Sequence, residues 1–180
     1  MKDLRQLTLI IFLLTLFNYS AYAQEEEENK EEEELKNRVV FSLGYTWIPK
    51  GAELSESEAE SGFFVPAVGF DYFRKIHEKF EIGMMWDWEL DHYIVTGKEL
   101  ERERAMIFAL VLTYSITEKW KAFTGGGAEF EKHENLGIFR LGTEYAFEMQ
   151  RNWEFTPTLL FDIKKGYDTW GISLGFCKKF

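Results

Sequence analysis

The sequence predicts an all-β fold, an eight-stranded antiparallel up-and-down transmembrane β-barrel. Three observations predict it. Apolar and polar residues alternate with a period of two through many segments, which is typical of strands with two different faces. The chain begins with an export pattern, and it ends on an aromatic strand that closes at Phe180. No apolar run of 18 residues follows residue 23, so a membrane-spanning helix is not expected.

The first segment, residues 1–23, has the order of a secretory signal peptide. Lys2 and Arg5 precede an apolar stretch from residue 7 to residue 17, and Ala21-Tyr22-Ala23 matches an A-x-A cleavage site. The alternative is an uncleaved membrane anchor, but the apolar stretch is too short to span a bilayer comfortably. We therefore expect export and cleavage after Ala23.

Charge is concentrated in residues 24–37, which we expect to form an acidic disordered arm. Eight glutamates lie at positions 25–28 and 31–34. From residue 35 onward the chain has 18 basic and 22 acidic side chains, with no basic face that would suggest nucleic acid. Cys177 is the only cysteine, so an internal disulfide cannot form.

Residues 38–180 form the predicted barrel. Trp153–Ile163 and Phe80–Asp91 show the clearest alternation, with large apolar residues opposite polar ones. Six further segments follow the same pattern more weakly: Val39–Trp47, Phe64–Tyr72, Met106–Tyr114, Trp120–Glu131, Phe139–Phe147 and Trp170–Phe180.

Two kinds of residue interrupt these segments. Pro66 and Pro157 each remove a ladder donor, which predicts bulges or frayed ends there. Gly125-Gly126-Gly127 predicts a bend or bulge, and it is not a phosphate loop because no Lys-Ser/Thr follows it.

The connections alternate in length. Those near residues 75–79, 117–119 and 150–152 are short, whereas the segments 49–62 and 91–101 are longer. Short periplasmic turns and longer outer loops are typical of transmembrane barrels. This alternation places Phe180 and the mature N-terminus on the periplasmic side.

The large apolar face should meet lipid. An eight-stranded barrel has an interior only wide enough for side chains, and the aromatic rows of this chain would overfill it. The polar face then points into the lumen, where its charges need partners. The candidate lumen ion-pair residues are Arg140, Glu144, Glu129, Asp87 and Lys121, with Lys179 and Glu148 as further members.

The outward aromatics sort into two groups by height, as expected for girdles at the two membrane interfaces. The periplasmic group is Tyr72, Phe80, Tyr114, Trp120, Phe147, Trp153 and Phe180, and the outer group is Trp47, Phe64, Trp88, Phe139 and Trp170. Ordinary enrichment of aromatics in strands is the alternative.

On this pattern the chain resembles the small OmpA/OmpX-like outer-membrane β-barrel proteins of Gram-negative bacteria. The most telling part is the last strand, where Leu174, Phe176 and Phe180 share the outward face. The resemblance implies that these three residues are an assembly signal for the barrel-assembly machinery, and that the protein is located in the outer membrane among its lipids. Lys178 departs from the pattern at an outward position, where its ammonium group can snorkel to the headgroups.

The sequence shows no catalytic constellation. His77, His92 and His133 have only local acidic neighbours, and no serine motif of the G-x-S-x-G type occurs. We expect surface histidines, no metal site, no cofactor and no enzymatic activity.

The function predicted from these observations is a structural or surface-interaction role without an open pore. Residues 49–62 are the candidate contact for an extracellular partner. Three alternatives remain: a narrow porin-like channel for ions or small solutes, an enzyme that modifies outer-leaflet lipid, and a soluble ligand-binding barrel.

Overall fold

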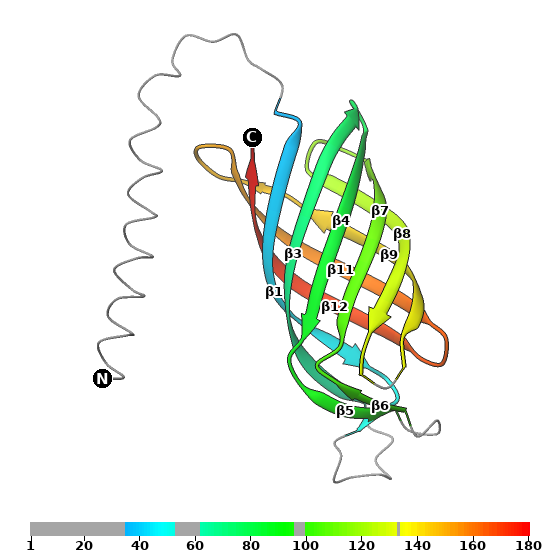
Figure 1. Ribbon diagram of the computed structural model, residues 1–180. Helices are drawn as coiled ribbons and strands as arrows, with labels where there is room; N and C mark the ends of the chain where they lie inside the picture. Colours follow the sequence, from blue (N-terminus) through cyan, green and yellow to red (C-terminus); the bar gives the residue numbers. More distant parts are fainter. Residues whose placement is uncertain (1–34, 53–61, 96–99, 133) are drawn as a thin grey trace, which may run out of the picture. The chain divides into compact units, whose positions relative to one another are not determined.

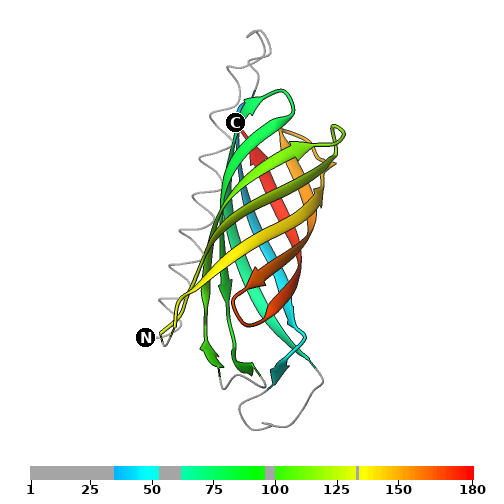
Figure 2. The same cartoon turned by 90° about the vertical axis from the view of Figure 1, so that its right-hand side faces the viewer.

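The computed structural model describes residues 35–52, 62–95, 100–132 and 134–180 of the 180-residue chain. Eight long antiparallel strands follow one another around a closed ring, in which β9 pairs with β11 and β12 pairs with β1 (Figures 1 and 2). Their bounds are β1 Asn37–Ile48, β3 Phe63–His77, β4 Phe80–Glu89, β7 Met106–Ser115, β8 Trp120–Phe130, β9 Leu136–Tyr145, β11 Trp153–Lys164 and β12 Asp168–Lys179. The predicted eight-stranded barrel is confirmed.

The two ends of the barrel differ as the sequence predicts. At the turn end, where Phe180 lies, the connections are the short segments 78–79, 116–119 and 149–152. The short strand β10 (Phe147–Glu148) pairs with β11 at this end. At the loop end, opposite Phe180 in Figure 1, lie the connections that carry β2, β5 and β6.

The segment expected to be a plain loop, 91–101, contains regular structure instead. β5 (His92–Val95) and β6 (Leu100–Glu103) pair as a hairpin, and β2 (Gly51–Ala52) adds a third strand. These strands form a sheet separate from that of the barrel. The barrel strand β4 accordingly ends at Glu89 rather than at Asp91.

Both prolines lie at the limits of ladders. The β3–β4 register begins at Ala67, one residue after Pro66. The β9–β11 register begins at Thr158, one residue after Pro157, opposite the break between β9 and β10. A missing amide donor is tolerated at these positions because no ladder bond on that side requires it.

The triple glycine does not form a bulge, because β8 keeps an unshifted register with both neighbours from Lys121 to Glu129. It allows close approach of the backbone instead. A Cβ on Gly125 or Gly127 would collide with the carbonyl oxygen of Leu110 or Phe108 on β7. Only glycine fits such contacts.

The barrel is apolar outside and charged inside. Along β1, Phe41, Leu43 and Tyr45 are each more than half exposed, whereas Arg38 is 3% exposed. A continuous outward row of aromatics crosses six strands as direct cross-strand partners: Phe155, Phe176, Phe41, Phe70, Trp86 and Phe108. Among the described residues, no helix is long and apolar enough to cross a membrane.

Candidate functional site

The candidate site is the lumen, which is filled by side chains in four layers. The first layer, at the turn end, is a network of ion pairs. The Arg38 guanidinium lies 2.7 Å from Glu81 and 2.8 Å from Glu144, and the Lys121 ammonium lies 2.8 Å from Glu81. These four side chains come from β1, β4, β8 and β9, so the layer ties opposite walls of the barrel together.

The second layer is apolar. Phe73 and Phe123 are almost fully buried and belong to one cluster with Val40, Met85 and Val111. Phe73 lies across Gly83, its direct partner on β4, where a Cβ would overlap the ring. The Arg38 guanidinium lies 3.8 Å above the Phe73 ring centroid, which joins the first layer to the second.

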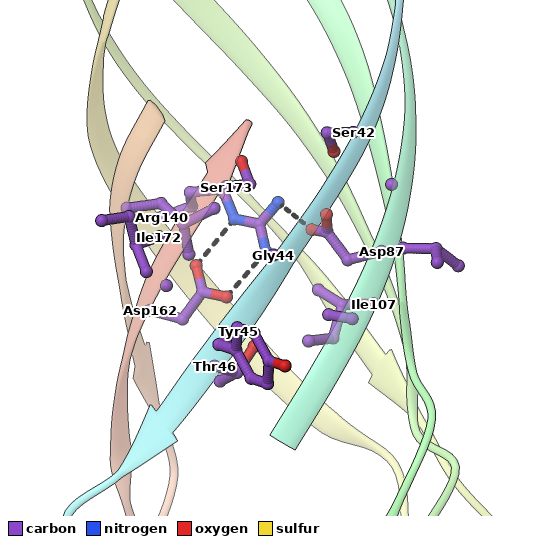
Figure 3. A pocket seen from close by; sticks show the side chains of 15 residues that line it. Ser42, Gly44, Tyr45, Thr46, Asp87, Ile107, Arg140, Asp162, Ile172 and Ser173 are labelled. Carbon is purple, nitrogen blue, oxygen red and sulfur yellow. Dashed lines mark hydrogen bonds and ion pairs between the residues drawn. The ribbon is translucent and has the colours of Figure 1, made fainter. Parts of the chain in front are cut away.

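The third layer is centred on Arg140, in the middle of the lumen. Its Nε and Nη2 atoms each lie 2.7 Å from an oxygen of Asp162, and its Nη1 lies 2.6 Å from Asp87 (Figure 3). Arg140 and Asp162 are 1% exposed, so the fork-like geometry replaces the lost hydration of both charges.

Beside Arg140 lies a small cavity, lined by side chains including Ser42, Thr46, Asp87 and Ser173 (Figure 3). Its volume is about 20 Å³, enough for about one water molecule. The side chains beside the guanidinium therefore leave room for about one water molecule in this cavity.

The fourth layer closes the loop end. The Lys164 ammonium lies 2.6 Å from Glu129, and the Tyr167 hydroxyl lies 2.8 Å from the same carboxylate. The Tyr93 hydroxyl donates a hydrogen bond to Glu89 at 2.7 Å. Burial raises the pKa of Tyr93 well above its ordinary value, so its hydroxyl stays protonated and remains a donor.

Arg102, from β6 of the hairpin, completes this layer. Its Nε lies 3.0 Å from Glu129 and its Nη1 donates a hydrogen bond at 2.5 Å to the carbonyl oxygen of Glu134. The side chain is fully buried. An apolar cluster surrounds these groups: Ile48, Val65, Tyr93, Val95, Leu136 and Tyr167.

The structure places all five candidate ion-pair residues on the inward face. Asp87 and Arg140 form an ion pair in the third layer. Lys121 and Glu144 belong to the first layer, and Glu129 belongs to the fourth. The expectation that Glu148 joins the lumen is wrong, because Glu148 lies exposed on β10.

Sequence reasoning missed Arg38, Arg102, Lys164 and the two tyrosines of the fourth layer. Lys164 lies two residues after Asp162 on β11, so the period-two pattern could have predicted that its side chain points inward. The pattern could not have predicted the burial of Arg102, because Arg102 lies in a segment without alternation.

The other predicted residues lie on the surface or outside the described residues. Phe176, Phe180 and Leu174 all point outward and are about half exposed. His92 Nε2 lies 2.7 Å from Glu101 across the hairpin. His133, the predicted signal peptide, most of the predicted acidic arm and residues 53–61 of the candidate contact segment lie outside the described residues. Within the described part of the chain, no group of three or more His, Cys, Asp or Glu residues is arranged to hold a metal ion.

Comparisons with known proteins agree with this architecture. No protein-family model matches the chain, and no curated protein sequence matches it. Among solved structures, Ail, the attachment invasion locus protein of Yersinia pestis, aligns with a TM-score of 0.50 at 10% identity, covering 81% of this chain and 99% of Ail. The N-terminal β-barrel domain of Pseudomonas aeruginosa OprF aligns with a TM-score of 0.53 at 9% identity, covering 81% and 98%. Neisserial surface protein A aligns with a TM-score of 0.50 at 8% identity, covering 80% and 97%.

These likenesses define the class: the chain has the fold of the small outer-membrane β-barrels. The resemblance to OmpA/OmpX-like proteins is thereby confirmed at the level of fold. At identities of 8–10% the likeness does not extend to activity.

Proposed function

We propose that this chain is a bacterial outer-membrane protein with a structural or surface-interaction role, that it is not an enzyme, and that its barrel does not conduct. Export through a cleaved signal peptide of residues 1–23 precedes its insertion. The observation that carries the proposal is a barrel whose large apolar side chains point outward and whose charged side chains fill the lumen.

The inverted distribution supports insertion in a membrane. The aromatic row around Phe41, Phe70 and Trp86 is about half exposed, whereas Arg140 and Glu129 are buried. In water such an apolar belt would be a large aggregation-prone surface, but in lipid it replaces the missing apolar core. The closed ladder leaves the eight long strands without an exposed edge.

The filled lumen supports a role without transport. The apolar layer around Phe73 and Phe123 separates the charged layers, and the cavity beside Arg140 holds about 20 Å³. Hydrated ions need a continuous polar path, and an apolar layer across the lumen argues against one.

Planar-bilayer recordings of the purified full chain test the absence of conduction. We expect no steady current above the bare-bilayer background, and steady ion-selective currents would establish the narrow-channel alternative instead. Mass spectrometry of outer-membrane lipid, with and without the protein, tests the absence of enzymatic activity. A lipid product that depends on the protein would overturn that part of the proposal.

Fractionation of Gram-negative cells that express the full chain tests the location. We expect the protein in the outer-membrane fraction, released only by detergent, with a gel mobility that changes on heating. Extraction into buffer without detergent would favour the soluble barrel.

A further inference from the structure

The outward face of the barrel carries cationic side chains in one place. Along the eight long strands, as far as the structure describes them, the lysine and arginine side chains that point outward are Lys178 on β12 and Arg74 on β3. The other cations of these strands, Arg140 and Lys121 among them, belong to the inward face. Charges on an otherwise apolar belt are costly in hydrocarbon, so they need the membrane interface or a partner of opposite charge.

Both cations lie at the turn end, on either side of β1. Lys178 is the direct partner of Val39, and Arg74 is the direct partner of Asn37, two residues earlier on β1. With strands about 4.8 Å apart and a rise of about 3.4 Å per residue, the Cα atoms of Lys178 and Arg74 lie roughly 12 Å apart. Side chains of this length can reach one small group that lies between them, above β1.

Lys178 is held in place beside an aromatic ring. Its ammonium group donates a hydrogen bond at 2.6 Å to the carbonyl oxygen of Arg151 and lies 5.6 Å from the centre of the Trp153 ring. Tryptophan favours the headgroup level of a bilayer, so these contacts place the ammonium group at that level. Neither contact neutralises the charge, because one partner is a neutral carbonyl and the other is a neutral ring.

Arg74 and its neighbours add further donors. Among the described residues, no ion pair joins Arg74 or Lys178 to a carboxylate, that of the terminal Phe180 included. The Tyr72 hydroxyl donates to Asn37 Oδ1 at 2.8 Å, which leaves the amide nitrogen of Asn37 as a donor. Guanidinium, ammonium and amide nitrogen together are complementary to an anion with several oxygens, such as a phosphate.

The same three strands carry an apolar groove farther along the outward face. Its volume is about 470 Å³. The outward side chains that line it are Leu43, Tyr45, Pro66, Val68, Ile172 and Leu174. Leu43 lies four residues after Val39, which is roughly 14 Å along the strand and within the thickness of about 15 Å that one leaflet of hydrocarbon has. An acyl chain that starts between the two cations can therefore reach the groove.

We propose that the outward face of β12, β1 and β3 at the turn end binds an anionic phospholipid. Lys178, Arg74 and Asn37 hold its phosphate, and an acyl chain runs along β1 into the groove at Leu43 and Val68. A phosphoglycerol headgroup fits better than phosphocholine, because it brings no ammonium group toward the two cations. The site rests on the proposed insertion of the barrel in a membrane, and the predicted orientation assigns it to the periplasmic leaflet.

Native mass spectrometry of the folded full chain in a neutral detergent tests this site. Dioleoyl phosphatidylglycerol and dioleoyl phosphatidylcholine are titrated separately at low salt, and the fraction of protein that retains one lipid gives an apparent Kd for each. We expect phosphatidylglycerol to bind at least about tenfold more tightly, because each basic side chain near anionic lipid contributes roughly a fivefold factor. Lys178→Gln combined with Arg74→Gln should reduce this preference to less than about twofold.

Lys79→Gln combined with Lys119→Gln is the matched control. It removes two exposed cations at the same end of the barrel, from the turns between β3 and β4 and between β7 and β8. The preference for phosphatidylglycerol should persist in this control. Heat-modifiable gel migration shows whether each variant is folded. If the double variant does not fold, Lys178→Gln and Arg74→Gln alone should each lower the preference by about fivefold.

Four results would overturn the site. Equal affinity of the parent chain for both lipids means that the cations do not select an anionic headgroup. An equal loss of preference in the control means that the total charge of the turn end controls binding. Displacement of phosphatidylglycerol by an equal concentration of glycerol phosphate means that the face is a simple anion site. A dimer that the parent forms and that Lys178→Gln with Arg74→Gln abolishes would assign this face to a second copy of the chain.

Cell fractionation separates failure of this site from failure of the proposed function. A chain that fractionates with the outer membrane but shows no lipid preference refutes the site alone. Extraction into buffer without detergent would refute both, because the outward face would then meet water rather than lipid.

Discussion

The guanidinium of Arg140 lies against the carboxylate of Asp162 with two nitrogen–oxygen distances of 2.7 Å, and the two residues are direct cross-strand partners on β9 and β11. Asp87, on β4 across the lumen, contacts the same guanidinium at 2.6 Å. One side chain therefore links three strands, two adjacent and one opposite. Its contribution is best measured by its removal.

Arg140→Met should destabilise the barrel by about 3–5 kcal/mol, because Asp87 and Asp162 would be left in the lumen without the guanidinium that pairs with them. The free energy of unfolding by urea, followed by the heat-modifiable gel shift, gives the measurement. Lys165→Met is the matched control, since it removes one cation from an exposed loop position. A control within about 0.5 kcal/mol of the parent is expected, and similar losses for both variants would contradict the role of the buried pair.

Gly127→Ala should destabilise the barrel by about 1–3 kcal/mol, because the new Cβ meets the Phe108 carbonyl and the backbone must move. The neighbouring Gly126→Ala should be almost neutral, since its Cβ has only the Ile138 carbonyl oxygen at 3.5 Å, an ordinary contact. Urea unfolding of both variants in the same micelles gives the comparison. Equal stabilities would show that close approach of β7 does not explain the glycine.

The period-two pattern predicted which residues face the lumen more reliably than which residues meet there. Parity alone places Asp87 and Arg140 inside, because side chains alternate along each strand. Their contact joins residues 53 positions apart and depends on the stagger of strands around the ring. A single sequence carries no direct signal for that stagger, so the partner of each charge had to come from the structure.

The β5–β6 hairpin was not predicted from the sequence for a different reason. Leu100–Glu103 has three charged residues in succession, so no alternation marks it as a strand. Its order comes from tertiary contacts, namely burial of Arg102 against Glu129 and of Tyr93 against Glu89. Local propensity has little weight where a short strand is held by buried partners.

Phe73 and Gly83 should be energetically coupled, since they are direct partners and the three atoms nearest to a Cβ at Gly83 all belong to the Phe73 ring. Gly83→Ala alone should cost about 1–3 kcal/mol through overlap with the ring. In a Phe73→Ala background the same substitution should cost much less, with a coupling free energy of about 0.5–3 kcal/mol. A double-mutant cycle on urea unfolding measures it, and additive effects would contradict the contact.

Phe180→Ser separates an assembly role from a stability role. Phe180 is 53% exposed, and its backbone exchanges two hydrogen bonds with Asn37, which the substitution leaves in place. Phe130→Ser is the matched control, because Phe130 is 44% exposed and ends β8. Both side chains face lipid, so both variants should show similar small losses in urea unfolding after refolding in micelles. If the terminal aromatic is read during assembly, only Phe180→Ser should lower the amount of protein in the outer membrane of a Gram-negative host several-fold. Equal amounts of the two variants in that fraction would show that Phe180 is not an assembly signal. The unfolding measurements in micelles show separately whether the two variants differ in stability.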